Sequence, residues 1–107
     1  MIITRGDVVT LAAQSDKPRP AVIIQSNRVG TATVLIAPIT SETADAAPIR
    51  IPLAPSEGNG LRTQSDIMVD KVFPIPRARI GTRIGRLDAE TMRRLEASLL
   101  FVLGFAD

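Results

Sequence analysis

The stretch RPAVIIQSNRVGTATVLIAPI, residues 19–39, decides the fold of this chain. It contains two runs rich in β-branched residues, Arg19–Ser26 and Thr31–Ile39, separated by the turn-forming residues Asn27–Gly30. β-Branched side chains favour an extended backbone, and a short polar turn between two such runs is typical of neighbouring strands. The centre of the chain is therefore predicted to be a strand–turn–strand unit.

Four further stretches on either side of this unit also have strand character. Strands are predicted at residues 7–12, 49–53, 66–72 and 79–87, where apolar and polar residues alternate or β-branched residues cluster. Pro52 lies inside the second of these strands and cannot donate a backbone hydrogen bond, so that strand is expected at a sheet edge.

The period of the apolar residues changes after Leu87, and a single helix is predicted over residues 88–103. Asp88 is in position to be the N-cap and Gly104 to end the helix. The apolar residues recur at helical spacing and are expected to face the core: Met92, Leu95, Leu99, Val102 and Leu103. The fold class that follows is mainly β, a small, curled, mostly antiparallel barrel of five to seven strands with a C-terminal helix, in one domain over residues 1–107.

The composition excludes several kinds of chemistry. The 107 residues are 45% hydrophobic and include neither cysteine nor histidine. A thiolate nucleophile, a disulfide, a cysteine zinc site and a histidine base are therefore excluded. Catalysis would have to use Arg, Lys, Asp, Glu, Ser or Thr. Asp7 interrupts the apolar run that a signal peptide needs, and no apolar stretch could span a bilayer, so a cytoplasmic protein is expected.

Positive charge gathers in the last third of the chain, although the net charge is only +2. Arg77, Arg79, Arg83 and Arg86 lie between Val72 and Leu87 with no acid among them. The planar guanidinium suits bidentate contacts to phosphate, so a nucleic-acid surface is one interpretation, and a solvated basic rim is the other. With no Trp or Tyr and three Phe, stacking of bases on aromatic rings has little support.

Metal and nucleotide sites find no support in the spacing of residues. The glycine-containing segments match neither a dinucleotide loop nor a phosphate-binding loop. Asp66 and Asp70 share one face if the strand is regular, but about 13 Å of rise would then separate them. No metal or cofactor is predicted.

Several segments, in order along nearly the whole chain, resemble the MazF/PemK family of toxins. They are Arg5-Gly6-Asp7-Val8-Val9, residues 19–26, Ala37-Pro38-Ile39-Thr40-Ser41, residues 49–53, Asn59-Gly60-Leu61, residues 65–70 and Ile84-Gly85-Arg86-Leu87 with the following helix. Each segment alone is weak, and their succession is the specific part. The chain departs from many members at Asp70-Lys71, where they carry Asp-Gln, and its first loop is short; both differences bear on substrate choice.

The resemblance implies an SH3-like barrel, a homodimer, a cognate antitoxin with an acidic and apolar tail, and metal-independent, sequence-specific cleavage of single-stranded RNA. In that chemistry the ribose 2′-OH attacks the adjacent phosphorus, giving a 2′,3′-cyclic phosphate and a 5′-OH. By resemblance, the catalytic residues fall on Arg19 and Thr40.

Physical chemistry supports a stabilising role for both residues. Arg19 lies between Pro18 and Pro20 and is permanently charged, so it suits a phosphate that gains negative charge in the transition state. It is a poor general base, because removing a proton from a guanidinium is very costly. Thr40 can donate to a phosphate oxygen. The base is left open, with Lys71 and solvent as candidates, and the residues expected to bind substrate are Ser41, Lys71, Arg77, Arg79 and Arg86.

Other interpretations remain for the same residues. Arg19 taken alone is typical of an ordinary surface arginine at a strand start, and Asp70 with Lys71 of a solvated pair. The alternative function is a non-catalytic toxin that resembles CcdB and binds DNA gyrase. That branch has a Trp near its C-terminus, and this chain ends Gly104-Phe105-Ala106-Asp107. A dimeric scaffold without chemistry is the third interpretation.

Overall fold

The computed structural model describes residues 2–12 and 19–106, and this part of the chain forms seven strands and one α-helix. Two short 3-10 turns precede the last two strands. The elements in chain order are β1 (Asp7–Leu11), β2 (Arg19–Ile23), β3 (Thr33–Thr40), β4 (Arg50–Leu53), β5 (Ser65–Met68), η1 (Val69–Lys71), β6 (Phe73–Pro76), η2 (Arg77–Arg79), β7 (Ile80–Arg86) and α1 (Ala89–Val102). The mainly β fold with a C-terminal helix is confirmed.

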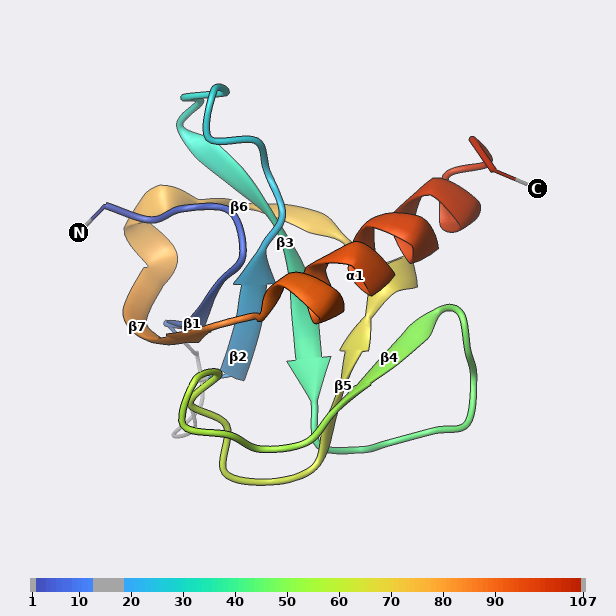
Figure 1. The fold of residues 1–107 in the computed structure, drawn as a ribbon. Helices are drawn as coiled ribbons and strands as arrows, with labels where there is room; N and C mark the ends of the chain where they lie inside the picture. Colours follow the sequence, from blue (N-terminus) through green and yellow to red (C-terminus); the bar gives the residue numbers. More distant parts are fainter. Residues whose placement is uncertain (1, 13–18, 107) are drawn as a thin grey trace.

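The strands form one antiparallel sheet in the order β4-β5-β3-β2-β1-β7, and β6 pairs with β3 outside this path. The sheet curls, and α1 crosses one of its faces (Figure 1). β4 lies at an edge of the sheet, as Pro52 predicted. The strand–turn–strand unit of the central stretch is also confirmed, because β2 and β3 pair directly with Ala21 opposite Pro38.

Both faces of the central strands are buried, which explains why their apolar residues run without interruption. Successive residues of a strand point to opposite faces. Val8 and Val22 belong to the cluster that includes Leu95 of α1, whereas their neighbours Val9 and Ala21 belong to a second cluster on the other side. The curl of the sheet therefore gives one short strand two apolar surfaces to contact.

Two of the predicted strands end earlier than expected. β2 stops at Ile23 because the carbonyl of Leu35 accepts from the backbone N–H groups of both Ile24 (3.1 Å) and Gln25 (3.3 Å), which breaks the regular ladder. β5 stops at Met68 because the chain turns into η1. Asp70 consequently lies on that turn and does not share a strand face with Asp66.

Strand β6 was not predicted, since its sequence Phe73-Pro74-Ile75-Pro76 contains two prolines. It nevertheless pairs with β3 over four residues, from Thr33 opposite Pro76 to Ile36 opposite Phe73. Its other side pairs with no strand in the described part of the chain, so the missing N–H groups are tolerated there.

The helix begins and ends where its capping residues predicted. The carboxylate of Asp88 accepts a hydrogen bond of 2.7 Å from the backbone N–H of Thr91, and this bond lowers the pKa of Asp88. Gly104 has a φ of +82°, and the N–H of Phe105 bonds to the carbonyl of Leu100 at 2.8 Å, as in a Schellman motif. In the predicted apolar stripe, Leu95 is buried and Met92, Leu99 and Val102 are partly buried against the core, whereas Leu103 is 64% exposed.

The described part of the chain contains no helix both long and apolar enough to cross a membrane.

Candidate functional site

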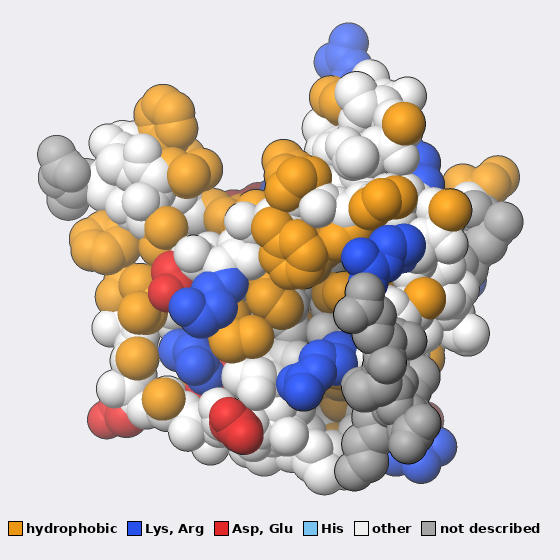
Figure 2. Space-filling view, turned by 180° about the vertical axis from the view of Figure 1, so that it is seen from behind, with side chains coloured by type: hydrophobic (Ala, Val, Ile, Leu, Met, Phe, Trp, Pro, Cys, Tyr) orange, Lys and Arg blue, Asp and Glu red, His pale blue; other side chains and the backbone are white. Residues whose placement is uncertain are grey.

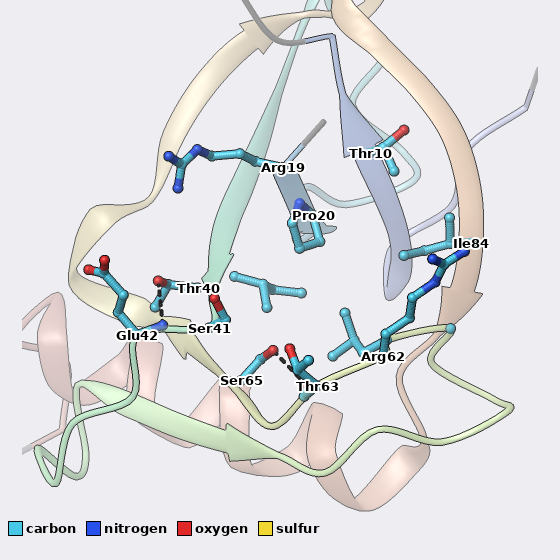
Figure 3. Close-up of a pocket in the computed structure, with 13 residues that line it drawn as sticks. Thr10, Arg19, Pro20, Thr40, Ser41, Glu42, Arg62, Thr63, Ser65 and Ile84 are labelled. Carbon is cyan, nitrogen blue, oxygen red and sulfur yellow. Dashed lines mark hydrogen bonds between the residues drawn. The ribbon is translucent and has the colours of Figure 1, made fainter. Parts of the chain in front are cut away.

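An open cavity of about 810 Å³ lies at the end of the sheet where β2 begins and β3 ends. Side chains from β1, β2, β3, β7 and the long loop between β4 and β5 line it (Figure 3). Its residues are Thr10, Arg19, Pro20, Ile39, Thr40, Ser41, Glu42, Gly60, Leu61, Arg62, Thr63, Ser65 and Ile84. A volume of this order is within the range of small-ligand sites.

The register of β2 and β3 brings Arg19 and Thr40 together. Ala21 lies opposite Pro38 in this antiparallel pair, and continuing the same register by two residues places Arg19 opposite Thr40. Residues that are directly opposite project from the same side of a sheet. Figure 3 shows both side chains on the same side of the cavity. The Arg19 side chain is exposed and has no ion-pair partner within the described ranges, so it can receive an anion.

The hydroxyl of Thr40 is already oriented by the backbone that follows it. Its oxygen accepts a hydrogen bond of 3.1 Å from the N–H of Glu42, a local turn that Thr commonly forms. Because the oxygen accepts this bond, the O–H is left to donate into the cavity. Ser41 lies beside it on the cavity wall.

The opposite wall is the loop between β4 and β5, which contributes Arg62 (Figure 3). Backbone contacts hold this loop against β7. The N–H of Arg86 donates to the carbonyl of Gly58 at 2.8 Å, and a Cβ built on Gly85 would lie 2.5 Å from that oxygen. A side chain at position 85 is therefore incompatible with this approach, and the glycine allows the loop to reach the cavity.

The remaining basic residues that the sequence predicted to bind substrate do not line this cavity. Arg77 donates to the carbonyls of Thr31 (2.6 Å) and Val29 (3.3 Å), and Arg79 to that of Ala12 (3.4 Å). Arg86 bonds to the buried carboxylate of Asp7 at 2.8 Å. Lys71 lies 3.7 Å from the carboxylate of Asp70 on η1. The structure thus brings Arg19, Thr40 and Ser41 together and gives the other residues partners elsewhere.

Of the two prolines that flank Arg19 in the sequence, the structure describes only Pro20. Pro20 lines the cavity, whereas Pro18 lies outside the described residues, as does most of the first loop.

Glu42 and Arg62 are the cavity residues of greatest chemical interest that sequence reasoning missed. Glu42 follows the predicted site by one residue, so its adjacency was the only available signal. Arg62 lies in a loop rich in turn-forming residues, where no periodicity assigns a direction to a side chain. Within the described ranges, no group of three or more His, Cys, Asp or Glu residues is arranged to hold a metal ion.

Comparison with known proteins gives consistent results for sequence and fold. The family model described as PemK-like, MazF-like toxin of type II toxin-antitoxin system matches residues 4–103. The probable endoribonuclease MazF of Mycolicibacterium smegmatis is 42% identical over 106 residues, which cover 95% of this chain and 97% of that protein.

Two solved structures are similar over nearly the full length. Mycobacterium tuberculosis toxin MazF-mt6 has a TM-score of 0.77 at 27% identity, covering 92% of this chain and 96% of its own. An endoribonuclease in complex with its cognate antitoxin, from Mycobacterial species, has a TM-score of 0.81 at 21% identity and covers 99% of both chains. At that identity the second likeness concerns the fold alone.

Proposed function

The chain belongs to the PemK-like, MazF-like toxin family of type II toxin-antitoxin systems, and on this premise we propose that it cleaves single-stranded RNA at the cavity of Arg19 and Thr40. It is an endoribonuclease and the toxin of such a system. The observation that carries the proposal is the β2–β3 register, which sets an exposed arginine opposite a threonine hydroxyl at an open cavity. The toxin domain extends over residues 1–107, and it acts in the cytoplasm, where its substrate is found.

The proposed reaction is a transesterification that needs no metal. The 2′-OH loses its proton and attacks the adjacent phosphorus, and the bond from phosphorus to the 5′ oxygen breaks. That oxygen takes up a proton from solvent, so the products are a 2′,3′-cyclic phosphate and a 5′-OH. Negative charge builds on the nonbridging oxygens in the transition state. The Arg19 guanidinium neutralises it, and the Thr40 hydroxyl, together with Ser41, donates to the same oxygens. Arg62, on the opposite wall of the cavity, contacts the RNA backbone beyond the scissile phosphate.

The decisive experiment is cleavage of a long RNA by the purified protein in EDTA. We expect fragments that end in 2′,3′-cyclic phosphate and begin with 5′-OH. Intact RNA would reject the proposal. A gyrase supercoiling assay addresses the CcdB-like alternative, which the match to a relative named as an endoribonuclease disfavours.

Thr40→Val is expected to slow cleavage by about 10- to 100-fold, because it removes one donor to the phosphate while keeping the shape of the side chain. Thr40→Ser retains the hydroxyl and should retain most of the rate. Single-turnover cleavage at saturating enzyme measures both. Equal rates for the valine and serine variants would exclude the hydroxyl from the reaction.

Glu42 takes the place of Lys71 as the proposed acceptor of the 2′-OH proton. It is the one carboxylate among the described residues that line the cavity, whereas Lys71 lies outside it. Glu42→Gln is expected to reduce the cleavage rate about 100-fold. It should also tighten RNA binding, because it removes a negative charge near the phosphates. A rate that stays unchanged would leave solvent as the base.

Partner binding has its support in exposed apolar side chains at the end of α1. Seen from behind the helix, hydrophobic side chains project at the end of α1 and also gather across the neighbouring face (Figure 2). Four at the helix end are at least 49% exposed: Leu100, Phe101, Leu103 and Phe105. Exposed apolar patches of this kind mark protein contacts. We propose that a second copy of the chain and the apolar, acidic tail of an antitoxin cover such surfaces. Co-expression with the antitoxin gene should yield a complex containing a toxin dimer.

A further inference from the structure

An ion pair between partly buried Arg50 and buried Asp66 contacts the turn that follows Thr40. The Oδ2 atom of Asp66 accepts from the backbone N–H of Ala44 at 2.9 Å and from Nη1 of Arg50 at 3.2 Å. The same Nη1 donates to the carbonyl of Glu42 at 3.0 Å. Asp66 is 2% exposed. The pair thus holds two backbone groups of residues 42–44, called here the Thr40 turn.

The sheet places these two charged groups behind the turn. Arg50 lies opposite Met68 and Pro52 opposite Asp66 in the β4–β5 register, so Arg50 and Asp66 are diagonal neighbours on adjacent strands. Ile51 and Ile67, between them, face the core. The side chains of alternate residues therefore project together from the other side of these strands.

A buried ion pair adds little net stability, because the cost of removing two charges from water offsets most of their attraction. Its geometric effect is larger. Both hydrogen bonds to the turn involve a charged group, the Asp66 carboxylate or the Arg50 guanidinium, which strengthens them. The backbone N–H of Glu42, which orients the Thr40 hydroxyl, belongs to the same residue as one of the two bonded groups, the Glu42 carbonyl.

We infer that Arg50 and Asp66 are positioning residues for RNA cleavage, acting through the Thr40 turn. The inference rests on the proposed function. The pair fixes the backbone at Glu42 and Ala44, so the Thr40 hydroxyl and the Glu42 carboxylate keep their directions toward the scissile phosphate.

The chain contains a matched control at another place in the sheet. The carboxylate of Asp7 is fully buried and accepts from the backbone N–H of Thr4 at 2.8 Å and from Nη1 of Arg86 at 2.8 Å. It therefore has the same kinds of hydrogen-bond partners as Asp66, an N–H group and an arginine, and Arg83 lies 3.9 Å away as a further ion-pair partner. Neither Asp7 nor its partners line the cavity.

The experiment compares Asp66→Ala, Asp66→Asn and Asp7→Ala in single-turnover cleavage and in thermal denaturation. Both alanine variants should lower the Tm, because each leaves a backbone N–H and an arginine without their partner. At a temperature where all are folded, Asp66→Ala should lose on the order of 10- to 100-fold in maximal rate with little change in RNA affinity. Asp7→Ala should keep its rate. Asp66→Asn keeps an oxygen acceptor and should recover most of the activity.

Amide hydrogen exchange gives a readout that does not depend on cleavage. Asp66→Ala should speed exchange at Ala44, and Asp7→Ala should speed it at Thr4. If Asp66→Ala is unfolded, Arg50→Lys carries the test, since the shorter lysine keeps the charge beside Asp66 but loses the bond to Glu42. It should show the same selective loss of rate to a smaller degree.

Two outcomes overturn the inference while leaving the proposed function intact. The first is a wild-type rate in folded Asp66→Ala, or in Arg50→Lys where that variant is used. The second is an equal loss of rate in Asp7→Ala, which would indicate a general effect of stability. Wild-type protein that leaves RNA intact rejects the ribonuclease function and the positioning role together.

Discussion

Arg19→Ala is expected to reduce RNA cleavage about 1,000-fold and to leave the fold intact. The guanidinium is the permanent positive charge that the β2–β3 register sets opposite Thr40, and removing a single preorganised donor to a developing oxyanion typically costs two to three orders of magnitude in rate. The side chain is exposed and makes no ion pair within the described ranges, so the Tm should change little. Single-turnover kinetics and thermal denaturation measure the two effects separately.

The control for this variant is Arg94→Ala, which removes the same charge from an exposed position on α1. It is expected to cleave RNA at the wild-type rate, because position 94 does not line the cavity. The cleavage rate of Arg19→Lys should lie between those of Arg19→Ala and the wild type, because lysine keeps the charge but lacks the planar guanidinium that contacts two phosphate oxygens. Cleavage by Arg19→Ala at the wild-type rate would remove this residue from the mechanism.

Gly85→Ala is expected to be the most destabilising small substitution in the sheet. A Cβ at this position would lie 2.5 Å from the carbonyl oxygens of both Gly58 and Asn59, and backbone atoms cannot move away as a flexible side chain can. The β4–β5 loop would have to separate from β7. We expect a loss of about 3 kcal/mol in the free energy of unfolding, which corresponds to about 15 °C in Tm for a domain of this size.

The same substitution at Gly58 provides the control. A Cβ there would meet only the Ser56 hydroxyl at 3.8 Å, an ordinary contact. Gly58→Ala should therefore keep the wild-type Tm within about 2 °C. Folded Gly85→Ala protein should also show weaker RNA binding, because Arg62 belongs to the displaced wall. Equal melting temperatures for the two variants would contradict the close approach of loop and strand.

Local patterns predicted most elements because each depends on neighbours in sequence. Asp88 and Gly104 have capping preferences that act within one helical turn, and the helix ends at both as expected. The exceptions have long-range causes. The prolines of β6 argue against a strand, and only the free edge beside β3 makes Pro74 acceptable there. Similarly, the end of β2 depends on a carbonyl of β3, Leu35, that accepts two N–H groups.

The candidate site was predictable only in part, for a related reason. Arg19 and Thr40 were identified by resemblance, and their proximity follows from the β2–β3 register, which a strand–turn–strand unit determines almost locally. The sequence from Arg77 to Arg86 shows a concentration of positive charge, but it does not indicate where each of these side chains points. In the fold, Arg77 is bonded to the β2–β3 loop and Arg86 to Asp7. Charge density alone could not distinguish a guanidinium available to phosphate from one bonded within the fold.

The sequence by itself determined six of the seven described strands, the helix with both caps, and the absence of cysteine and histidine chemistry. Those features depend on backbone preferences and side-chain types within a few residues. Only the tertiary structure decided that the β4–β5 loop closes the cavity with Arg62, and that Asp66 and Arg50 hold the Thr40 turn. These contacts join residues 8 or more positions apart, and their formation depends on how the sheet curls and on where glycine permits two backbones to meet.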